Sequence, residues 1–325
     1  MVNQNSKILV IGLGSMGRRR IRSLQTLGYT DLYGFDLNSE RALSAKNEYK
    51  ILIVNDIKSL KFDCLIISTP PDKHLEYMIY AKCNCIPCFV EASVLLEETL
   101  IASLADGNND YVYPSCTFLF HPIIKDLHER ITSDYYGKVT NFSYHSGQYL
   151  PDWHPWEDIK DYYVSKKETG GAREIVPFEL TWMIKLFGRP DRILGVRAKT
   201  GILDNCEIDD TYSFVMEYLD KTASITVDVV SRAALRDLRV NFEKGTFYWN
   251  WSDGFALMRD LNNNIERIIP HNFVSEFGYD PNIGEQMYID ELESFFKALN
   301  GGRKLYPNSL HEDLQILTLL QLIEN

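Results

Sequence analysis

The stretch Lys7-Ile-Leu-Val-Ile-Gly12-Leu-Gly14-Ser-Met-Gly17-Arg-Arg-Arg-Ile-Arg22 decides the fold of the first part of the chain. Its apolar run Ile8–Ile11 predicts a strand buried on both faces, and a helical pattern then continues to Gly28. The three glycines between them have the spacing GxGxxG, which makes a tight turn, admits a pyrophosphate and lets the helix pack on the strand. The order strand, glycine turn and helix therefore predicts a dinucleotide-binding site.

The next apolar run, Leu32–Phe35, ends in Asp36, about twenty residues beyond the last glycine. A carboxylate at this place can accept both hydroxyls of an adenosine ribose and would repel a 2′-phosphate. Asp36 therefore predicts NAD as the cofactor. NADP stays open, because the guanidinium of Arg41 could swing towards a 2′-phosphate.

The composition is that of an ordinary globular protein of about two domains, with 325 residues, 45% hydrophobic and 24% charged. The net charge of −11 argues against nucleic acid or an anionic membrane surface as a partner. The first residues lack the regions of a signal peptide, and no apolar run approaches the length that spans a bilayer. A cytoplasmic location is therefore expected.

The six cysteines do not form the framework of a disulfide-rich protein. Cys83, Cys85 and Cys88 are close together, but no second cluster of Cys or His completes a metal site, and Cys88 begins an apolar strand. We expect reduced thiols and no metal.

The whole pattern predicts an α/β protein with two domains. Residues 1–122 alternate short apolar runs with helical segments, which predicts a Rossmann domain with a doubly wound parallel sheet. Residues 123–325 gather runs with period-two alternation around a helix, Ala172–Phe187, and predict an α+β domain on a largely antiparallel sheet. Two helices, Glu285–Leu299 and Leu310–Ile323, close the chain, and the last of them could pack back on the first domain.

Several motifs resemble the Gfo/Idh/MocA family of nicotinamide-dependent sugar oxidoreductases, over essentially the whole chain. They are Gly12–Gly17, Ser68-Thr-Pro70 with His74, Phe89-Val-Glu91, Phe120-His-Pro122, Gly170-Gly171 and Glu285–Phe296. A more specific stretch, Gly147–Asp158, resembles a subgroup associated with bacterial surface-sugar pathways, including nonulosonic acids related to sialic acid.

The resemblance implies an oxidoreductase acting on a sugar or nucleotide sugar in surface-glycan biosynthesis. The cofactor would bind to the first domain, and the sugar would lie against the sheet of the second. The open face of that sheet would form a homo-oligomer, a dimer or tetramer. The expected cofactor-binding residues are Gly12, Gly14, Ser15, Met16, Gly17, Asp36, Arg41, Ser68, Thr69, Pro70, His74, Glu91 and Ala92. For His74, cofactor contact and simple packing are equally open.

Three residues depart from what the family usually has at its catalytic positions. Ala92 stands where the family has a lysine that contacts cofactor and substrate, and Ile175 and Phe178 align with its aspartate and histidine. The usual oxidation, in which a base takes the hydroxyl proton as hydride leaves for NAD, would need other groups in this chain.

Two carboxylates flank Ile175 and Phe178 around the helix axis. Glu174 lies about 40° beyond Phe178, and Glu179 lies about 40° beyond Ile175 on the other side. Glu174 and Glu179 are therefore the candidate catalytic residues, because a carboxylate beside apolar neighbours can have a raised pKa and act as acid or base. His154 is the candidate partner. The structural alternative is that Glu174 pairs with Arg173 or Lys185 at the surface and that Glu179 is structural.

The aromatic-rich stretch Tyr149–Asp158 suits the apolar side of a sugar ring. The structural alternative is that this stretch is only a connection packed between the domains. The expected substrate-binding residues are Trp153, His154, Trp156, Tyr163 and Phe178.

Two other functions stay open at this point. The chain could bind a dinucleotide as a ligand or structural element without catalysis, or perform non-redox net chemistry in which NAD is reduced and reoxidised in place.

Overall fold

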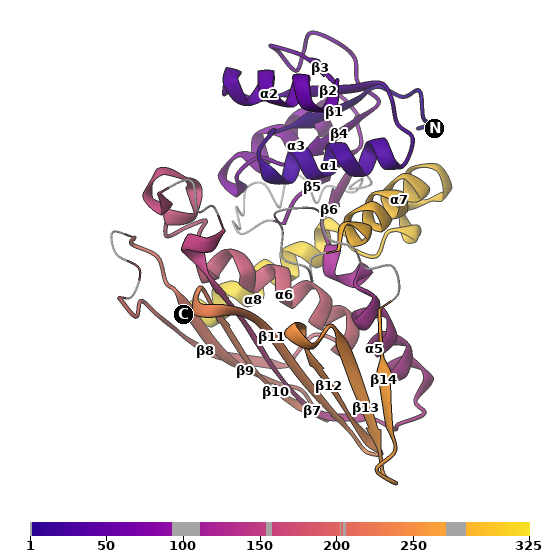
Figure 1. Ribbon diagram of the computed structural model, residues 1–325, viewed down its shortest axis with the longest axis vertical. Coiled ribbons are helices and arrows are strands. Elements are labelled where there is room, and N and C mark those ends of the chain that lie inside the picture. Colours follow the sequence, from indigo (N-terminus) through magenta and orange to yellow (C-terminus); the bar gives the residue numbers. More distant parts are fainter. Residues whose placement is uncertain (1, 93–110, 154–157, 202, 204–205, 271–283) are drawn as a thin grey trace. The chain divides into compact units, whose positions relative to one another are not determined.

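A computed structural model describes residues 2–92, 111–153, 158–201, 203, 206–270 and 284–325 (Figure 1). The chain forms two compact units. The first comprises Met1–Phe120 and Gly284–Gln315, and the second comprises His121–Ile283 and Ile316–Asn325. The predicted boundary after residue 122 lies close to the first crossing between the units. The sequence pattern also predicts a helix over residues 97–105, which lies outside the described residues.

The first unit is built on a six-stranded parallel sheet in the order β3-β2-β1-β4-β5-β6. Its strands are β1 (Ile8–Ile11), β2 (Leu32–Phe35), β3 (Leu52–Ile53), β4 (Cys64–Ile67), β5 (Cys88–Val90) and β6 (Val112–Pro114). The order reverses between β1 and β4, as in a doubly wound sheet. This confirms the predicted Rossmann architecture.

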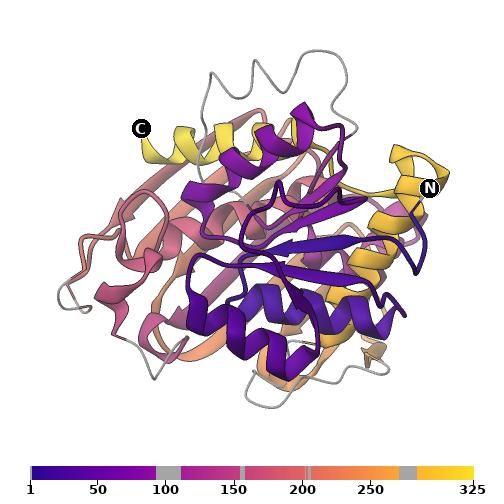
Figure 2. The same cartoon turned by 90° about the horizontal axis from the view of Figure 1, so that it is seen from above.

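Helices cover both faces of this sheet (Figure 2). Ile8 and Val10 of β1 belong to one core, with α1 (Ser15–Thr26), α2 (Ser39–Tyr49) and α7 (Glu285–Gly301). Leu9 and Ile11 belong to the other core, with α3 (His74–Cys83). Alternate side chains of one short strand therefore serve two cores, which explains why its sequence is apolar without interruption. Cys88 is buried in β5, whereas Cys83 and Cys85 are exposed.

Helix α7 differs from its predicted assignment to the second domain. It packs in the first unit, where the ring of Phe295 lies 5.9 Å from that of Phe89 and 4.9 Å from that of Tyr113. Its apolar face is visible in the sequence, but the sheet that it covers is not, because a helix can pack on any complementary apolar surface.

The second unit is built on an eight-stranded sheet in the order β14-β13-β12-β11-β7-β10-β9-β8. Its strands are β7 (Val139–Tyr149), β8 (Arg192–Ala198), β9 (Thr211–Glu217), β10 (Thr222–Asp228), β11 (Val230–Phe242), β12 (Gly245–Asn250), β13 (Phe255–Asp260) and β14 (Ile265–Ile268). Neighbouring strands are antiparallel except β7 and β10, which confirms the predicted largely antiparallel sheet. The sequence analysis did not predict β13 and β14, and all but one residue of β14 are exposed.

One face of this sheet packs on α6 (Ala172–Phe187), where the ring of Phe187 stacks on Phe142 at 3.9 Å. The remaining helices are α5 (Pro122–Ser133) and α8 (Leu310–Glu324), and the second half of α8 belongs to this unit. The short 3-10 helices of the chain are η1 (Pro71–Lys73), η2 (Thr117–Phe120), η3 (Leu150–Asp152), η4 (Ile159–Asp161), η5 (Tyr163–Ser165), η6 (Trp251–Asp253) and η7 (Arg303–Leu305). In the part of the chain that the structure describes, none of the helices is long and apolar enough to cross a bilayer.

Candidate functional sites in the two units

Two glycines of the turn after β1 are required by the fold itself. Gly12 has φ +88°, and a Cβ there would lie 2.6 Å from the carbonyl oxygen of Ser68. A Cβ on Gly17 would lie 1.8 Å from the carbonyl oxygen of Gly12. Side chains at these positions would overlap backbone atoms, so the strand, the turn and the helix can approach only if both residues are glycine.

Gly14 is different, because no atom of the described residues requires a glycine there. A Cβ there would meet nothing closer than the Arg41 guanidinium, at 4.0 Å. Gly14 is also the N-cap of α1, without a side chain that caps the helix and without an acidic residue in the first turn. Open space before uncapped N–H groups and a positive helix end suits a pyrophosphate, so the turn fits a dinucleotide.

This contrast gives a testable pair of variants. We expect Gly17→Ala to lower the free energy of unfolding by about 3 kcal/mol or more, because a Cβ would overlap backbone. Gly14→Ala should leave stability within about 0.5 kcal/mol but weaken NADH binding about tenfold or more. Thermal unfolding and fluorescence titration with NADH measure the two effects. Full NADH affinity in Gly14→Ala would contradict this assignment of the phosphate site.

Asp36 lies directly after β2 and is held in place through both carboxylate oxygens. Oδ2 accepts the backbone N–H of Leu13 at 2.8 Å, and Oδ1 accepts that of Asn38 at 2.8 Å. Nη1 of Arg41 lies 3.5 Å from Oδ2, so the guanidinium is close to the carboxylate. Each oxygen keeps acceptor capacity for a ribose hydroxyl, as NAD requires.

The motif after β4 is organised by a buried histidine. His74, the first residue of α3, donates from Nε2 to the carbonyl oxygen of Thr69 at 2.8 Å. Burial lowers the pKa of His74, so the ring is neutral and Nδ1 is an acceptor. Among the described residues, His74 Nδ1 and Thr69 Oγ1 have no hydrogen-bond partner. The buried ring holds the turn through the carbonyl oxygen of Thr69, which agrees with the packing alternative for His74.

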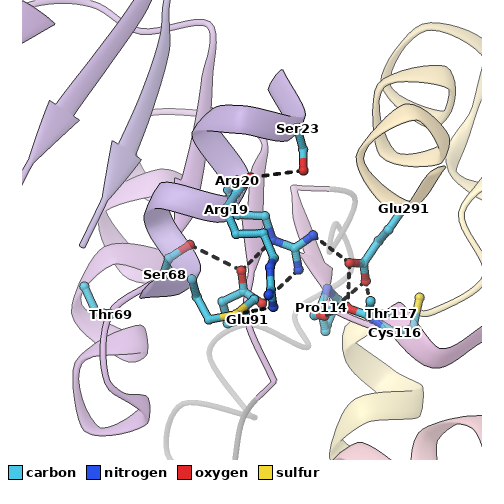
Figure 3. A network of polar contacts seen from close by, with 12 residues as sticks. Arg19, Arg20, Ser23, Ser68, Thr69, Glu91, Pro114, Cys116, Thr117 and Glu291 are labelled. Carbon is cyan, nitrogen blue, oxygen red and sulfur yellow. Dashed lines mark hydrogen bonds and ion pairs between the residues drawn. The ribbon is translucent and has the colours of Figure 1, made fainter. Parts of the chain in front are cut away.

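Glu91, directly after β5, belongs to a buried ionic network in the first unit (Figure 3). Arg20 of α1 donates to both its oxygens, from Nε at 2.6 Å and from Nη2 at 2.9 Å. Ser68 Oγ donates to Oε1 at 3.3 Å. The network therefore joins the ends of β4 and β5 to the helix that follows the glycine turn.

The same guanidinium also contacts Glu291 of α7, at 2.8 Å from Nη1 to Oε2. Glu291 is fully buried, and its other donors are Ser115 Oγ, the Cys116 N–H, Thr117 Oγ1 and Tyr306 Oη. Arg20 also lies 4.4 Å above the ring of Phe89. The sequence analysis missed this network. The sequence does contain one indication of it. Arg20 is three residues after Gly17 and therefore lies on the face of α1 that packs on the sheet.

The predicted cofactor residues come together at one edge of the sheet, because parallel strands place their carboxyl ends on the same side. The glycine turn follows β1, Asp36 follows β2, Ser68 follows β4, and Glu91 with half-buried Ala92 follows β5. Ser15 is exposed and Met16 half-buried at the start of α1.

In the second unit, the predicted catalytic residue Glu174 lies in the first turn of α6 and has a buried carboxyl. Its Oε1 accepts a hydrogen bond from Tyr163 Oη at 2.6 Å. Its Oε2 is buried and has no hydrogen-bond partner among the described residues. Burial raises the pKa of Glu174 to about 7, and the Tyr163 hydrogen bond opposes that shift. The carboxyl can therefore hold or release a proton near neutral pH.

The neighbouring charges do not support the surface alternative for Glu174. Arg173 pairs with Glu324, at 2.7 Å from Nε to Oε1, rather than with Glu174. Sequence analysis proposed Tyr163 only as a substrate contact, and its pairing with Glu174 was not foreseen. The two residues are eleven positions apart on η5 and α6, and no periodicity links them.

Glu179 is fully engaged by protein donors and agrees with its structural alternative. It is 1% exposed. Its oxygens accept hydrogen bonds from Tyr144 Oη, Trp182 Nε1, Ser146 Oγ and Arg236 Nε, at 2.8, 2.8, 3.2 and 3.0 Å. These contacts fix α6 to β7 and β11, and they occupy the lone pairs that a base would use.

The structure describes three of the predicted substrate-binding residues, Trp153, Tyr163 and Phe178. Trp153, just after η3, is half-buried, and its Nε1 is buried without a hydrogen-bond partner in the described part of the chain. Tyr163 and Phe178 are also half-buried. His154 and Trp156 lie outside the described residues, so their predicted roles remain predictions.

A family model described as the GFO/IDH/MocA C-terminal domain matches residues 124–248, which lie within the second unit. This match covers less than half of the chain. Strands β7–β11 and helix α6 fall inside the matched segment, and so do Tyr163, Glu174 and Glu179. A search of curated proteins found no match to the chain.

Solved structures share the fold of the whole chain at low sequence identity. An oxidoreductase from Agrobacterium radiobacter in complex with NAD+, L-tartaric acid and magnesium has a TM-score of 0.84 at 12% identity, covering 99% of this chain and 97% of that one. Levoglucosan dehydrogenase in complex with NADH and levoglucosan has a TM-score of 0.82 at 14% identity, covering 98% and 96%. UDP-N-acetylglucosamine 3-dehydrogenase from Acidithiobacillus ferrooxidans has a TM-score of 0.77 at 15% identity, covering 100% and 97%. These likenesses confirm the fold, a six-stranded parallel sheet followed by an eight-stranded, mostly antiparallel sheet.

Proposed function

We propose that the chain is an NAD-dependent oxidoreductase of the Gfo/Idh/MocA family that acts on a sugar or nucleotide sugar in bacterial surface-glycan synthesis. The single observation that carries this proposal is Glu174, a carboxyl with a pKa of about 7 and a buried oxygen without a partner among the described residues. The glycine turn and Asp36 support NAD, and the levoglucosan and UDP-N-acetylglucosamine dehydrogenases of the same fold support the substrate class.

In this proposal the bound NAD supplies the hydride acceptor for oxidation of a hydroxyl. Glu174 takes the hydroxyl proton on Oε2, while Tyr163 holds Oε1 and sets the orientation of the carboxylate. In the reverse direction the protonated Glu174 returns that proton. A group with a pKa near the working pH serves both directions, because both protonation states are populated.

The experiment is to purify the protein, identify any nucleotide that it retains, and follow NADH formation with NAD+ and a panel of free and UDP-linked sugars. Turnover of a sugar would support the proposal. Nucleotide binding without reduction or exchange of any sugar in the panel would favour a binding protein. Conversion without net NADH, with the nucleotide retained, would favour recycling of NAD in place.

For the cofactor, we expect tighter binding of NAD(H) than of NADP(H), by about tenfold or more, because the carboxylate of Asp36 repels a 2′-phosphate. Asp36→Ser should narrow the difference in affinity between NAD(H) and NADP(H). Adding Arg41→Ala to Asp36→Ser should restore the preference for NAD(H), because it removes the cation that would bind the 2′-phosphate. Isothermal titration of both cofactors into the parent, Asp36→Ser and the double variant gives the six affinities. NADP(H) binding as tight as NAD(H) in the parent would contradict the assignment.

We also propose a homo-oligomer formed through the sheet of the second unit. Three exposed apolar side chains support it: Leu194, Val196 and Val215 are 53%, 69% and 50% exposed, and Leu194 pairs with Val215 across β8 and β9. Sedimentation of the parent and of Val196→Glu tests this, and a monomeric parent would contradict it.

A further inference from the structure

The guanidinium of Arg20 lies between the carboxylates of Glu91 and Glu291. Every described donor to Glu291 is an N–H or O–H group, and Glu91 receives the Arg20 guanidinium on both oxygens. Both carboxylates therefore act as acceptors only, as ionised carboxylates do. Nearby, Arg19 and Arg22 share the single carboxylate of Glu285, and the guanidiniums of Arg19 and Arg20 both lie over the ring of Tyr288. These described charges balance, so what a ligand experiences depends on which charge lies nearest to it.

The carboxylate of Glu91 lies on a specific half of the parallel sheet. Asp36 marks the adenosine half, at the end of β2 on one side of the reversal between β1 and β4. Glu91 and its donor Ser68 follow β5 and β4 on the other side, the half that takes the second nucleotide in a doubly wound sheet. The Glu91 side chain is 14% exposed, whereas those of Arg20 and Glu291 are fully buried, so Glu91 is the charged group of these three that reaches this edge.

We propose that the Glu91 carboxylate, held by Arg20, makes this protein select the oxidised over the reduced cofactor. The inference rests on the proposed NAD-binding function. The nicotinamide ring carries one positive charge when oxidised and none when reduced, so a fixed negative charge favours NAD+ without a comparable effect on NADH. Half-buried Ala92 follows Glu91 and brings no cation to offset it.

The test is the ratio of the dissociation constants of NAD+ and NADH, measured by titration of each nucleotide into the same protein. Glu91→Gln removes the charge and should raise the ratio about fivefold, whereas Glu91→Asp keeps the charge and should leave the ratio near the parent value. Ala92→Lys adds a cation without disturbing the buried network, so it should also raise the ratio. This second variant keeps the test valid even if Glu91→Gln does not fold.

Two matched controls separate charge from other effects. Ala92→Met has the bulk of lysine without its charge and should leave the ratio unchanged. Glu293→Gln removes an exposed carboxylate of α7 that pairs with Lys297, and should also leave the ratio unchanged. If the parent binds both nucleotides but neither Glu91→Gln nor Ala92→Lys raises the ratio, the inference is wrong while the proposed function stands. If the parent binds neither nucleotide, both fail.

Discussion

Replacing Glu174 with glutamine should reduce the rate of hydride transfer about a hundredfold or more and leave NADH affinity within about twofold. Glutamine keeps the size of the side chain and can still accept the Tyr163 hydrogen bond, but it cannot take a proton. Single-turnover measurement of NADH formation gives the rate, and fluorescence titration gives the affinity. The matched control is Glu168→Gln, an exposed glutamate six residues earlier, which should turn over like the parent.

The pH dependence of the parent provides a second readout. The base must be ionised for oxidation, so kcat/KM should rise with pH through a pKa of about 7. Tyr163→Phe removes the hydrogen bond that lowers this pKa, and the rise should move to higher pH. A profile without a step near neutral pH in the parent, or an unchanged one in Tyr163→Phe, would contradict the role of the pair.

The Glu174 carboxyl should lower the free energy of unfolding of the parent at high pH, where it is ionised. The pKa of Glu174 is raised from 4.5 to about 7 in the folded protein, so folding favours the protonated form and this contribution falls as pH rises through that range. Glu174→Gln should therefore unfold with a free energy about 1 to 2 kcal/mol higher than the parent at about pH 8, with a smaller difference below about pH 5. A gain in stability with a loss of turnover is typical of a functional group rather than a structural one.

Removal of the buried guanidinium should have the largest effect on stability. Arg20→Met leaves Glu91 and Glu291 without their shared counter-ion and should lower the free energy of unfolding by about 3 to 5 kcal/mol. Chemical denaturation measures this. Arg18→Met is the control on the same helix, because its ion pair with Glu48 is partly exposed and should contribute less than about 1 kcal/mol.

A triple variant checks the cause of that loss. Adding Glu91→Gln and Glu291→Gln to Arg20→Met removes both carboxylates and should recover part of the lost stability, because uncompensated charges no longer lie in the core. No recovery would show that packing of the Arg20 side chain against Phe89, rather than charge, explains the loss.

The sequence predicted the first unit well because its signals are local. A buried strand, a glycine turn and the start of a helix are adjacent in the chain, and a Cβ on Gly12 or Gly17 would approach a backbone oxygen to 2.6 or 1.8 Å. Asp36 and Ser68 follow directly from the ends of their strands. The Arg20 network could not be predicted with the same certainty, since its partners Glu91 and Glu291 are 71 and 271 residues away.

The second unit shows the same limit at the candidate site. Helix periodicity placed Glu174 and Glu179 beside the apolar positions of α6, but could not show which carboxylate had protein donors. The structure separates them, because Glu179 accepts from four side chains and Glu174 from Tyr163. Burial of one oxygen without a partner among the described residues is a tertiary property, and the sequence does not contain it in readable form.

The most direct test of the account is the titration of the Glu174 carboxyl in the folded protein. In carbon-13 glutamate-labelled protein, the resonance that disappears in Glu174→Gln can be followed with pH by NMR without knowledge of the sugar. The account predicts that this carboxyl titrates near a pKa of about 7. Titration at the ordinary pKa of a glutamate, near 4.5, would contradict the claim that Glu174 is the acid–base group of this protein.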